Sequence, residues 1–219
     1  MTASTEDLTP DREYSALLEV IAWIDQHTTK DSLPTDERSL IAQGCLDAAI
    51  EYQAAVAVLH YARLHGSMLA LLRVLTESLV RGLWLQHCAN DAELTRFKSG
   101  AIDKPFGKLI EEIEERLGNT SRTLSNLKAS AWTAMNDFTH TGFIQVTRRH
   151  APGAVGANYP AKEIAEALSA AAVLGLIAAG ALIGMTGNAD LADAAIDRMK
   201  QYANRRAEIS VASTGPERR

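Results

Sequence analysis

A row of charged side chains interrupts an otherwise apolar helical stretch in the first half of the chain. Arg73, Glu77 and Arg81 (the charged row) follow one another at intervals of four residues. In an α-helix this spacing stacks the three side chains on one face, and Trp84 and His87 fall close to the same face. Because burial of unpaired charge is costly, the charged row is either an exposed face held by ion pairs or the wall of a polar pocket.

A second, strongly charged segment favours the pocket interpretation without excluding the exposed face. Glu111, Glu112, Glu114 and Glu115 form a dense acidic face, which we expect to be solvent-exposed. In the charged row, by contrast, each charge is isolated in its turn among leucine and valine residues. One glutamate between two arginines would leave a net positive site that suits a phosphate or a carboxylate.

A second stripe of polar and aromatic residues lies further along the chain. Trp132, Asn136 and His140 also recur at intervals of four residues. We expect His140 in the last turn of its helix, where the helix dipole stabilises the imidazolium and the side chain suits general acid or base catalysis. The alternative is a packed histidine that caps the helix end together with Thr139 and Thr141.

Other types of site are weakly supported. His60 and His65 are five residues apart, which places them on different faces of a continuous helix, and no His-Glu-x-x-His or Cys-x-x-Cys spacing occurs. No glycine-rich phosphate loop follows a strand, and no nucleophile elbow frames a serine. We therefore expect neither a metal ion nor another cofactor.

The composition is that of an ordinary globular protein. The 219 residues are 47% hydrophobic, and the formal net charge is −5. An acidic chain is a poor general polyanion binder, so we expect no DNA partner. Cys45 and Cys88 lie in apolar helical surroundings, and the N-terminus carries no basic and apolar signal segment, which together predict a cytoplasmic protein.

Helical periodicity is nearly continuous and strand signals are almost absent. We predict an all-α, single-domain bundle of about six or seven helices over residues 10–209, with disordered tails at 1–9 and 210–219. Residues 167–189 carry no charge and could in length cross a bilayer. Because they are mostly alanine and glycine with acidic flanks, we expect a central bundle helix and no membrane span.

Several residues mark the expected helix boundaries. Pro10 and Pro105 suit the first turns of helices, and Asn90 with Glu93 forms a capping box. Further expected boundaries are a helix over residues 35–65 ended by Gly66, a helix end at Gly118, a cap at Ser121 and a loop over residues 148–160. We expect the basic clusters Arg148-Arg149-His150 and Arg205-Arg206 to be solvated surface.

Four short motifs lie between roughly residues 40 and 150. They are Arg-x-x-x-Glu at Arg73, Arg-Gly-Leu-Trp-Leu from Arg81, Lys-Pro-Phe-Gly from Lys104 and Asn-Asp-Phe-Thr-His-Thr-Gly from Asn136. In these motifs the chain resembles an uncharacterised bacterial domain family related to the HEPN-like helical bundles. The resemblance implies a HEPN-like bundle, often dimeric. For many members it implies a metal-independent ribonuclease of a toxin–antitoxin or phage-defence system.

The active motif of that class is an arginine, usually followed by a polar residue, with a histidine four to six positions after the arginine. In this chain Met135 precedes Asn136, so Asn136 and His140 match while the arginine is missing from its place. Arg73 or Arg81 could supply the guanidinium from a neighbouring helix, because catalysis requires charge beside the phosphate and not adjacency in sequence. This hypothesis predicts that His140 and one of these arginines line the same cleft.

Two functions from different classes follow. The first is a non-catalytic or degenerate HEPN-like module, in which a polar cluster fixes helix register or a dimer contact; the cluster comprises Arg73, Glu77, Arg81, Trp84, Asn136 and His140. The alternative is a metal-independent endoribonuclease in which His140 moves a proton, Asn136 positions the substrate, and Arg73 or Arg81 offsets phosphate charge. The missing motif arginine favours the first function, and the placement of Asn136 and His140 favours the second. The partners expected are a second copy of the chain and either RNA or a small anionic ligand.

Overall fold

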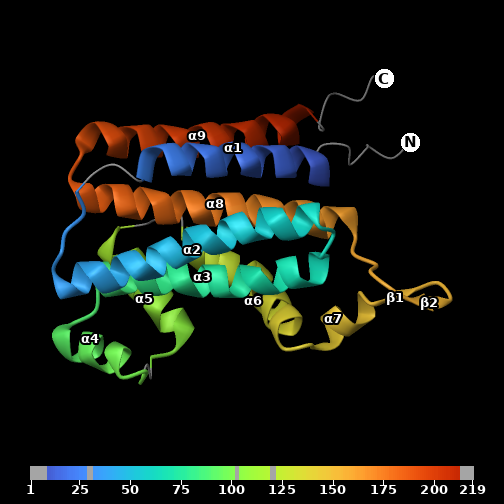
Figure 1. Ribbon diagram of the computed structural model, residues 1–219, viewed down its shortest axis with the longest axis horizontal. Helices are drawn as coiled ribbons and strands as arrows, with labels where there is room; N and C mark the ends of the chain where they lie inside the picture. The colour runs from blue at the N-terminus through green and yellow to red at the C-terminus, as the bar shows by residue number, and fades with distance from the viewer. Residues whose placement is uncertain (1–8, 29–31, 102–103, 119–121, 213–219) are drawn as a thin grey trace.

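The computed structural model describes residues 9–28, 32–101, 104–118 and 122–212, which are almost entirely helical. The all-α prediction is confirmed, although these residues form nine helices, not six or seven, and one small β-hairpin (Figure 1). The helices are α1 Pro10–Thr28, α2 Glu37–Tyr61, α3 His65–His87, α4 Asp91–Lys98, α5 Phe106–Arg116, α6 Thr123–Thr139, α7 Phe143–Thr147, α8 Ala161–Thr186 and α9 Ala189–Ala212. The strands β1 His150–Ala151 and β2 Ala154–Val155 pair antiparallel within the expected loop.

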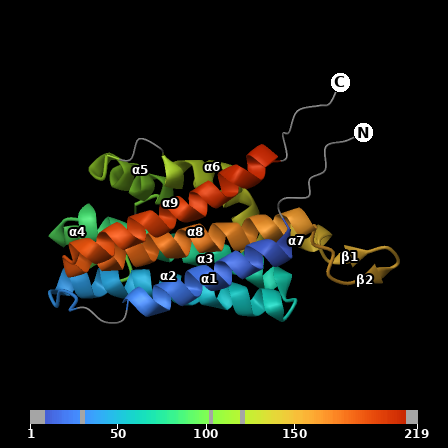
Figure 2. The same cartoon turned by 90° about the horizontal axis from the view of Figure 1, so that it is seen from above.

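The helices pack around α8. This helix contacts α1, α2, α3 and α9, while α5 and α6 pack against α3 (Figure 1). Seen from above, α8 runs along the length of the bundle, and the hairpin projects from one end (Figure 2). Helix α3 is therefore the element that joins the central layer to the smaller α5 and α6 layer.

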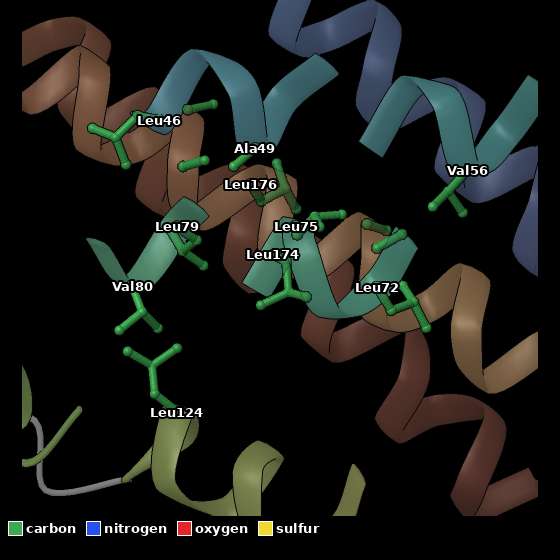
Figure 3. Packing of buried hydrophobic residues seen from close by; sticks show 14 of the residues in the cluster. Leu46, Ala49, Val56, Leu72, Leu75, Leu79, Val80, Leu124, Leu174 and Leu176 are labelled. Carbon is green, nitrogen blue, oxygen red and sulfur yellow. The ribbon is translucent and has the colours of Figure 1, made fainter. Parts of the chain in front are cut away.

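The core is built from small and branched aliphatic residues. Leu46 of α2, Leu75 of α3 and Leu174 of α8 are fully buried, and all three belong to the core between these helices (Figure 3). Val80 of α3 faces Leu124 of α6 on the other side of α3 (Figure 3). Because α3 is buried on both sides, a charge on this helix requires partners.

Helix α8 is long and apolar enough to cross a membrane, and among the described residues it alone passes that test. However, 61% of its most apolar 18-residue stretch is buried inside the bundle. Alanine and glycine dominate its sequence, so its neighbours approach closely. This burial is typical of the core helix of a soluble protein, as expected for the uncharged segment.

Several boundary predictions are confirmed, and one is wrong. Asn90 and Glu93 form the capping box at the start of α4, and α1 begins at Pro10. The predicted stop at Gly66 fails, because α2 ends at Tyr61 and the chain turns through Arg63, which is left-handed at φ 59°. Gly66 instead lies in the first turn of α3.

The break before α3 explains two further features. A Cβ atom on Gly66 would lie 2.5 Å from the Tyr159 hydroxyl, so this glycine allows a close approach of Tyr159. His60 and His65 belong to different helices, and their ring centroids lie 5.5 Å apart. The expectation that they diverge on one helix is therefore wrong.

The acidic face of α5 is only partly exposed, contrary to expectation. Glu114 is 7% exposed and accepts a hydrogen bond from the Ser125 backbone N–H at 3.0 Å. Dense charge on this helix therefore does not mark a purely solvated surface. The predicted cap at Ser121 and most of both predicted tails lie outside the described residues, while α9 continues to Ala212.

Two glycines offer a test of the α2 and α3 packing. A Cβ atom on Gly82 of α3 would lie 2.8 Å from Leu46 Cγ and 3.2 Å from the Ala42 carbonyl oxygen, whereas a Cβ on Gly44 of α2 meets nothing within 4 Å. We expect Gly82→Ala to lower the free energy of unfolding by about 1–3 kcal/mol through overpacking. Gly44→Ala should raise it by about 0.5–1 kcal/mol through helix propensity. Urea denaturation measures both, and equal effects would contradict the packing.

Candidate functional site

The charged row forms a ladder of ion pairs along α3. Arg73 Nε lies 2.9 Å from Glu77 Oε1, and Arg81 Nη2 lies 3.2 Å from Glu77 Oε2. The exposed fractions of the three side chains are 22% for Arg73, 16% for Glu77 and 38% for Arg81. One carboxylate is thus shared by two guanidinium groups, and the row is neither fully buried nor an open face.

Arg73 also reaches across to α6. Its Nη1 atom donates a hydrogen bond to His140 Nε2, and its guanidinium carbon lies 5.2 Å from the centre of the Trp132 ring. Trp132 in turn stacks on Phe106 of α5, with ring centroids 4.2 Å apart. Arg73 is therefore held by a carboxylate, an imidazole and an aromatic face from two helices.

Two further contacts hold α6 in register on α3. The Thr76 hydroxyl lies 3.9 Å from the Met135 sulfur, and the Thr139 hydroxyl donates to the Ala70 carbonyl oxygen at 3.3 Å. On α3, Ala70 and Thr76 lie on either side of Arg73. The two contacts therefore fix α6 along the stretch of α3 that carries Arg73.

His140 occupies the end of α6 and is exposed. It is the C-cap residue, and its backbone N–H bonds to the Asn136 carbonyl oxygen. A guanidinium group can only donate, so His140 Nε2 is the acceptor in the contact with Arg73, and the ring proton of the neutral imidazole then lies on Nδ1. The site therefore presents a solvent-accessible imidazole with a permanent positive charge beside it.

Asn136 lies on the same face of α6, between Trp132 and His140. Its Oδ1 atom is buried, and no described residue forms a hydrogen bond with it. Asn136 thus lies one turn before His140 on α6, and its side-chain oxygen is closed to solvent.

The other predicted members of the cluster lie elsewhere. Arg81 lines a cleft against α2 and α4, away from His140. Trp84 is buried, and its indole Nε1 donates to Glu112 Oε2 at 2.7 Å. His87, which was expected only near the face of the charged row and not in the cluster, lines a separate cleft with Cys88. The six-residue cluster is therefore divided, and Arg73, Glu77, Asn136 and His140 form its α3 and α6 part.

Lys104 is the centre of another cluster, formed with Trp84, Glu93 and Glu112, which the sequence did not reveal. Its Nζ lies 2.7 Å from Glu93 Oε1 and 2.8 Å from Glu112 Oε2, and 4.9 Å from the centre of the Trp84 ring. Burial acts to raise the pKa of Glu112, but the hydrogen bonds from Lys104 and Trp84 outweigh it and hold the pKa below its ordinary value. The pKa of Glu93 is lowered in the same way, with burial again opposed by Lys104 and the Asn90 backbone.

No three His, Cys, Asp or Glu side chains come together as a candidate metal site in the part of the chain that the structure describes. Among the described residues, His60 and His65 therefore do not form a three-ligand cluster of these types. Burial lowers the pKa of both histidines, and the charge of Arg63 acts in the same direction.

The Lys104 cluster makes stability depend on pH. Glu93 and Glu112 have lower pKa values in the folded chain than their ordinary value of 4.5, so the unfolded chain binds more protons in acid. Their contribution to the free energy of unfolding is complete above about pH 5 and is lost as the pH falls through the folded pKa values. We expect Lys104→Met to flatten the fall in stability between about pH 5 and pH 3.

Urea denaturation at a series of pH values measures this effect. Lys108→Met is the matched control, because Lys108 pairs with Glu111 on the exposed surface. An unchanged pH profile in Lys104→Met, or an equal change in both variants, would contradict the assignment.

Comparison with protein families places most of the chain in one family. Residues 46–206 match the model of a family of unknown function (DUF6988), and this span includes α3, α6 and the whole candidate site. No curated protein matches the chain, and no solved structure matches it. The comparisons show an uncharacterised domain family and give no activity.

Proposed function

The chain belongs to the DUF6988 family, and from the geometry of its site we propose that it is a HEPN-like helical bundle that cleaves single-stranded RNA without a metal cofactor. One observation carries this proposal: Arg73 of α3 meets His140 of α6. The arginine missing from its expected place before Asn136 is thus replaced by one from a neighbouring helix. Arg81 points into another cleft and takes no part.

The chemistry uses the 2′-hydroxyl of the RNA. The 2′-hydroxyl takes the place of Arg73 Nη1 on His140 Nε2, His140 removes the proton from this hydroxyl through that nitrogen, and the 2′ oxygen attacks the adjacent phosphorus. The bond from phosphorus to the 5′ oxygen of the next nucleotide breaks, and that oxygen takes a proton from water. The hydroxide that remains takes the proton held by His140, which restores the neutral imidazole. The products are a 2′,3′-cyclic phosphate and a 5′-hydroxyl. Arg73 stabilises the negative charge that develops on the phosphate oxygens, and Glu77 and Trp132 hold Arg73 in place.

The surface beside His140 suits single-stranded RNA. Phe143 follows His140 by three residues and is 79% exposed, so its ring is free to stack on an unpaired base. Arg149 and His150 are exposed on the hairpin that follows α7, while Arg148 pairs with Glu163 at 2.9 Å. A local basic and aromatic surface of this kind is compatible with an acidic chain.

A non-catalytic function is the second candidate. The observation in its favour is that Arg73 has three partners, Glu77, His140 and Trp132, and is mostly buried among them. In this version the network only fixes the register between α3 and α6. The two functions predict different consequences for substitutions of His140.

His140→Gln separates them, because the Gln carbonyl oxygen can still accept from Arg73 but cannot move a proton at neutral pH. We expect this variant to keep its thermal unfolding midpoint within a few degrees, and to lose RNA cleavage by about 10²- to 10⁴-fold. The assay follows mixed single-stranded RNAs in EDTA. A substrate with a 2′-deoxy group at the cleaved position should be resistant.

His27→Gln is the matched control, because His27 lies on α1, where its ring stacks on Trp23, and belongs to neither α3 nor α6. Equal cleavage by wild type, His140→Gln and His27→Gln would show a contaminating nuclease and reject the proposal. Absence of cleavage by wild type, together with a lower unfolding midpoint in His140→Ala, would favour the non-catalytic function.

A further inference from the structure

Arg81 faces a cleft of about 580 Å³ whose lining includes no residue of α6. The cleft lies between α2, α3 and the end of α4. It is lined by Ile41, Gly44, Cys45, Ala48, Ser78, Arg81, Phe97 and Gly100. Neither His140 nor Arg73 belongs to this lining, so the cleft is separate from the proposed catalytic site.

The cleft carries a net positive charge. Arg81 is the one charged residue among the described residues that line it. Its charge is only partly offset, because Glu77, its partner at 3.2 Å, also pairs with Arg73 at the shorter distance of 2.9 Å. The Arg81 side chain is 38% exposed. An anion in the cleft would therefore meet a guanidinium whose charge Glu77 only partly offsets.

The remaining lining combines a hydroxyl with apolar walls. Ser78 lies three residues before Arg81, on the same side of α3, and no described hydrogen bond involves its hydroxyl. Ile41 and Phe97 supply apolar surface on either side. Burial raises the pKa of the Cys45 thiol against the opposing charge of Arg81, so the thiol is neutral at pH 7 and does not repel an anion.

We propose that this cleft binds a small anion with an apolar body, such as an aryl or alkyl phosphate monoester. The anionic group pairs with Arg81 and Ser78, and the apolar body packs between Ile41 and Phe97. The ligand competes with Glu77 for Arg81, because both bind the same guanidinium. This binding does not require RNA cleavage and is measured independently of it.

Titration calorimetry with phenyl phosphate tests the site. We expect phenyl phosphate to bind about tenfold or more tightly than inorganic phosphate, since only the former uses the apolar walls. Arg81→Gln should weaken the binding by about tenfold or more, as expected for loss of a charged hydrogen-bonding group. Arg96→Gln on the exposed face of α4 is the matched control and should bind as wild type does.

Two further variants test the location and the competition. Gly44→Leu should block the cleft, because Gly44 lines it and a Cβ at this position meets nothing within 4 Å, so the added side chain starts in open space. Glu77→Gln should tighten the binding of phenyl phosphate, because it removes the competing carboxylate. Both predictions concern affinity for phenyl phosphate.

Three results would overturn the proposal. They are absence of phenyl phosphate binding by wild type, retention of binding in both Arg81→Gln and Gly44→Leu, and equal affinity for phenyl phosphate and inorganic phosphate. Binding that is lost in His140→Gln but kept in Arg81→Gln would place the anion at the α6 site, which would also overturn it. Failure of RNA cleavage has no bearing on these outcomes.

Discussion

The guanidinium of Arg73 is the interaction on which the joint between α3 and α6 depends. Helix α3 is buried by α2 and α8 on one side and by α5 and α6 on the other, so a charge on it must be matched by nearby groups. Glu77, Trp132 and His140 supply that match from two helices. His140 is one of the groups that satisfy this charge. The need to pair Arg73 therefore also fixes the position of a solvent-accessible imidazole.

The sequence predicted those parts of the fold that depend on local chemistry. Pro10 opens α1, and Asn90 caps α4 with Glu93, because each of these signals acts within one turn of helix. Gly66 misled the prediction. Its lack of a side chain serves the approach of Tyr159, a contact between segments far apart in the chain, while Arg63 makes the turn. Glu114 shows the same limit, since its buried carboxylate accepts hydrogen bonds from Ser125 of another helix.

In the candidate site, too, contacts within one helix were predictable and contacts between helices were not. Intervals of four residues predicted the ion pairs of Arg73 and Arg81 with Glu77, which lie within a single helix. Trp84 shares nearly the same helical face as Arg73, but it lies about 16 Å further along the axis at 1.5 Å per residue. There α3 meets Glu112 of α5 and not α6. The face of the helix on which a side chain lies was predictable. The helix that packs against this face at a given position depends on how the helices cross, which the spacing does not show.

The contact between Arg73 and His140 is the central claim, and the ring nitrogens of His140 report on it directly. Nitrogen-15 NMR of the histidine rings, at a pH where His140 is neutral, distinguishes a protonated Nδ1 from a protonated Nε2. Since Arg73 can only donate, the account predicts the Nδ1–H tautomer in wild type and a loss of that preference in Arg73→Met. A predominant Nε2–H tautomer in wild type, or no change in Arg73→Met, would contradict it.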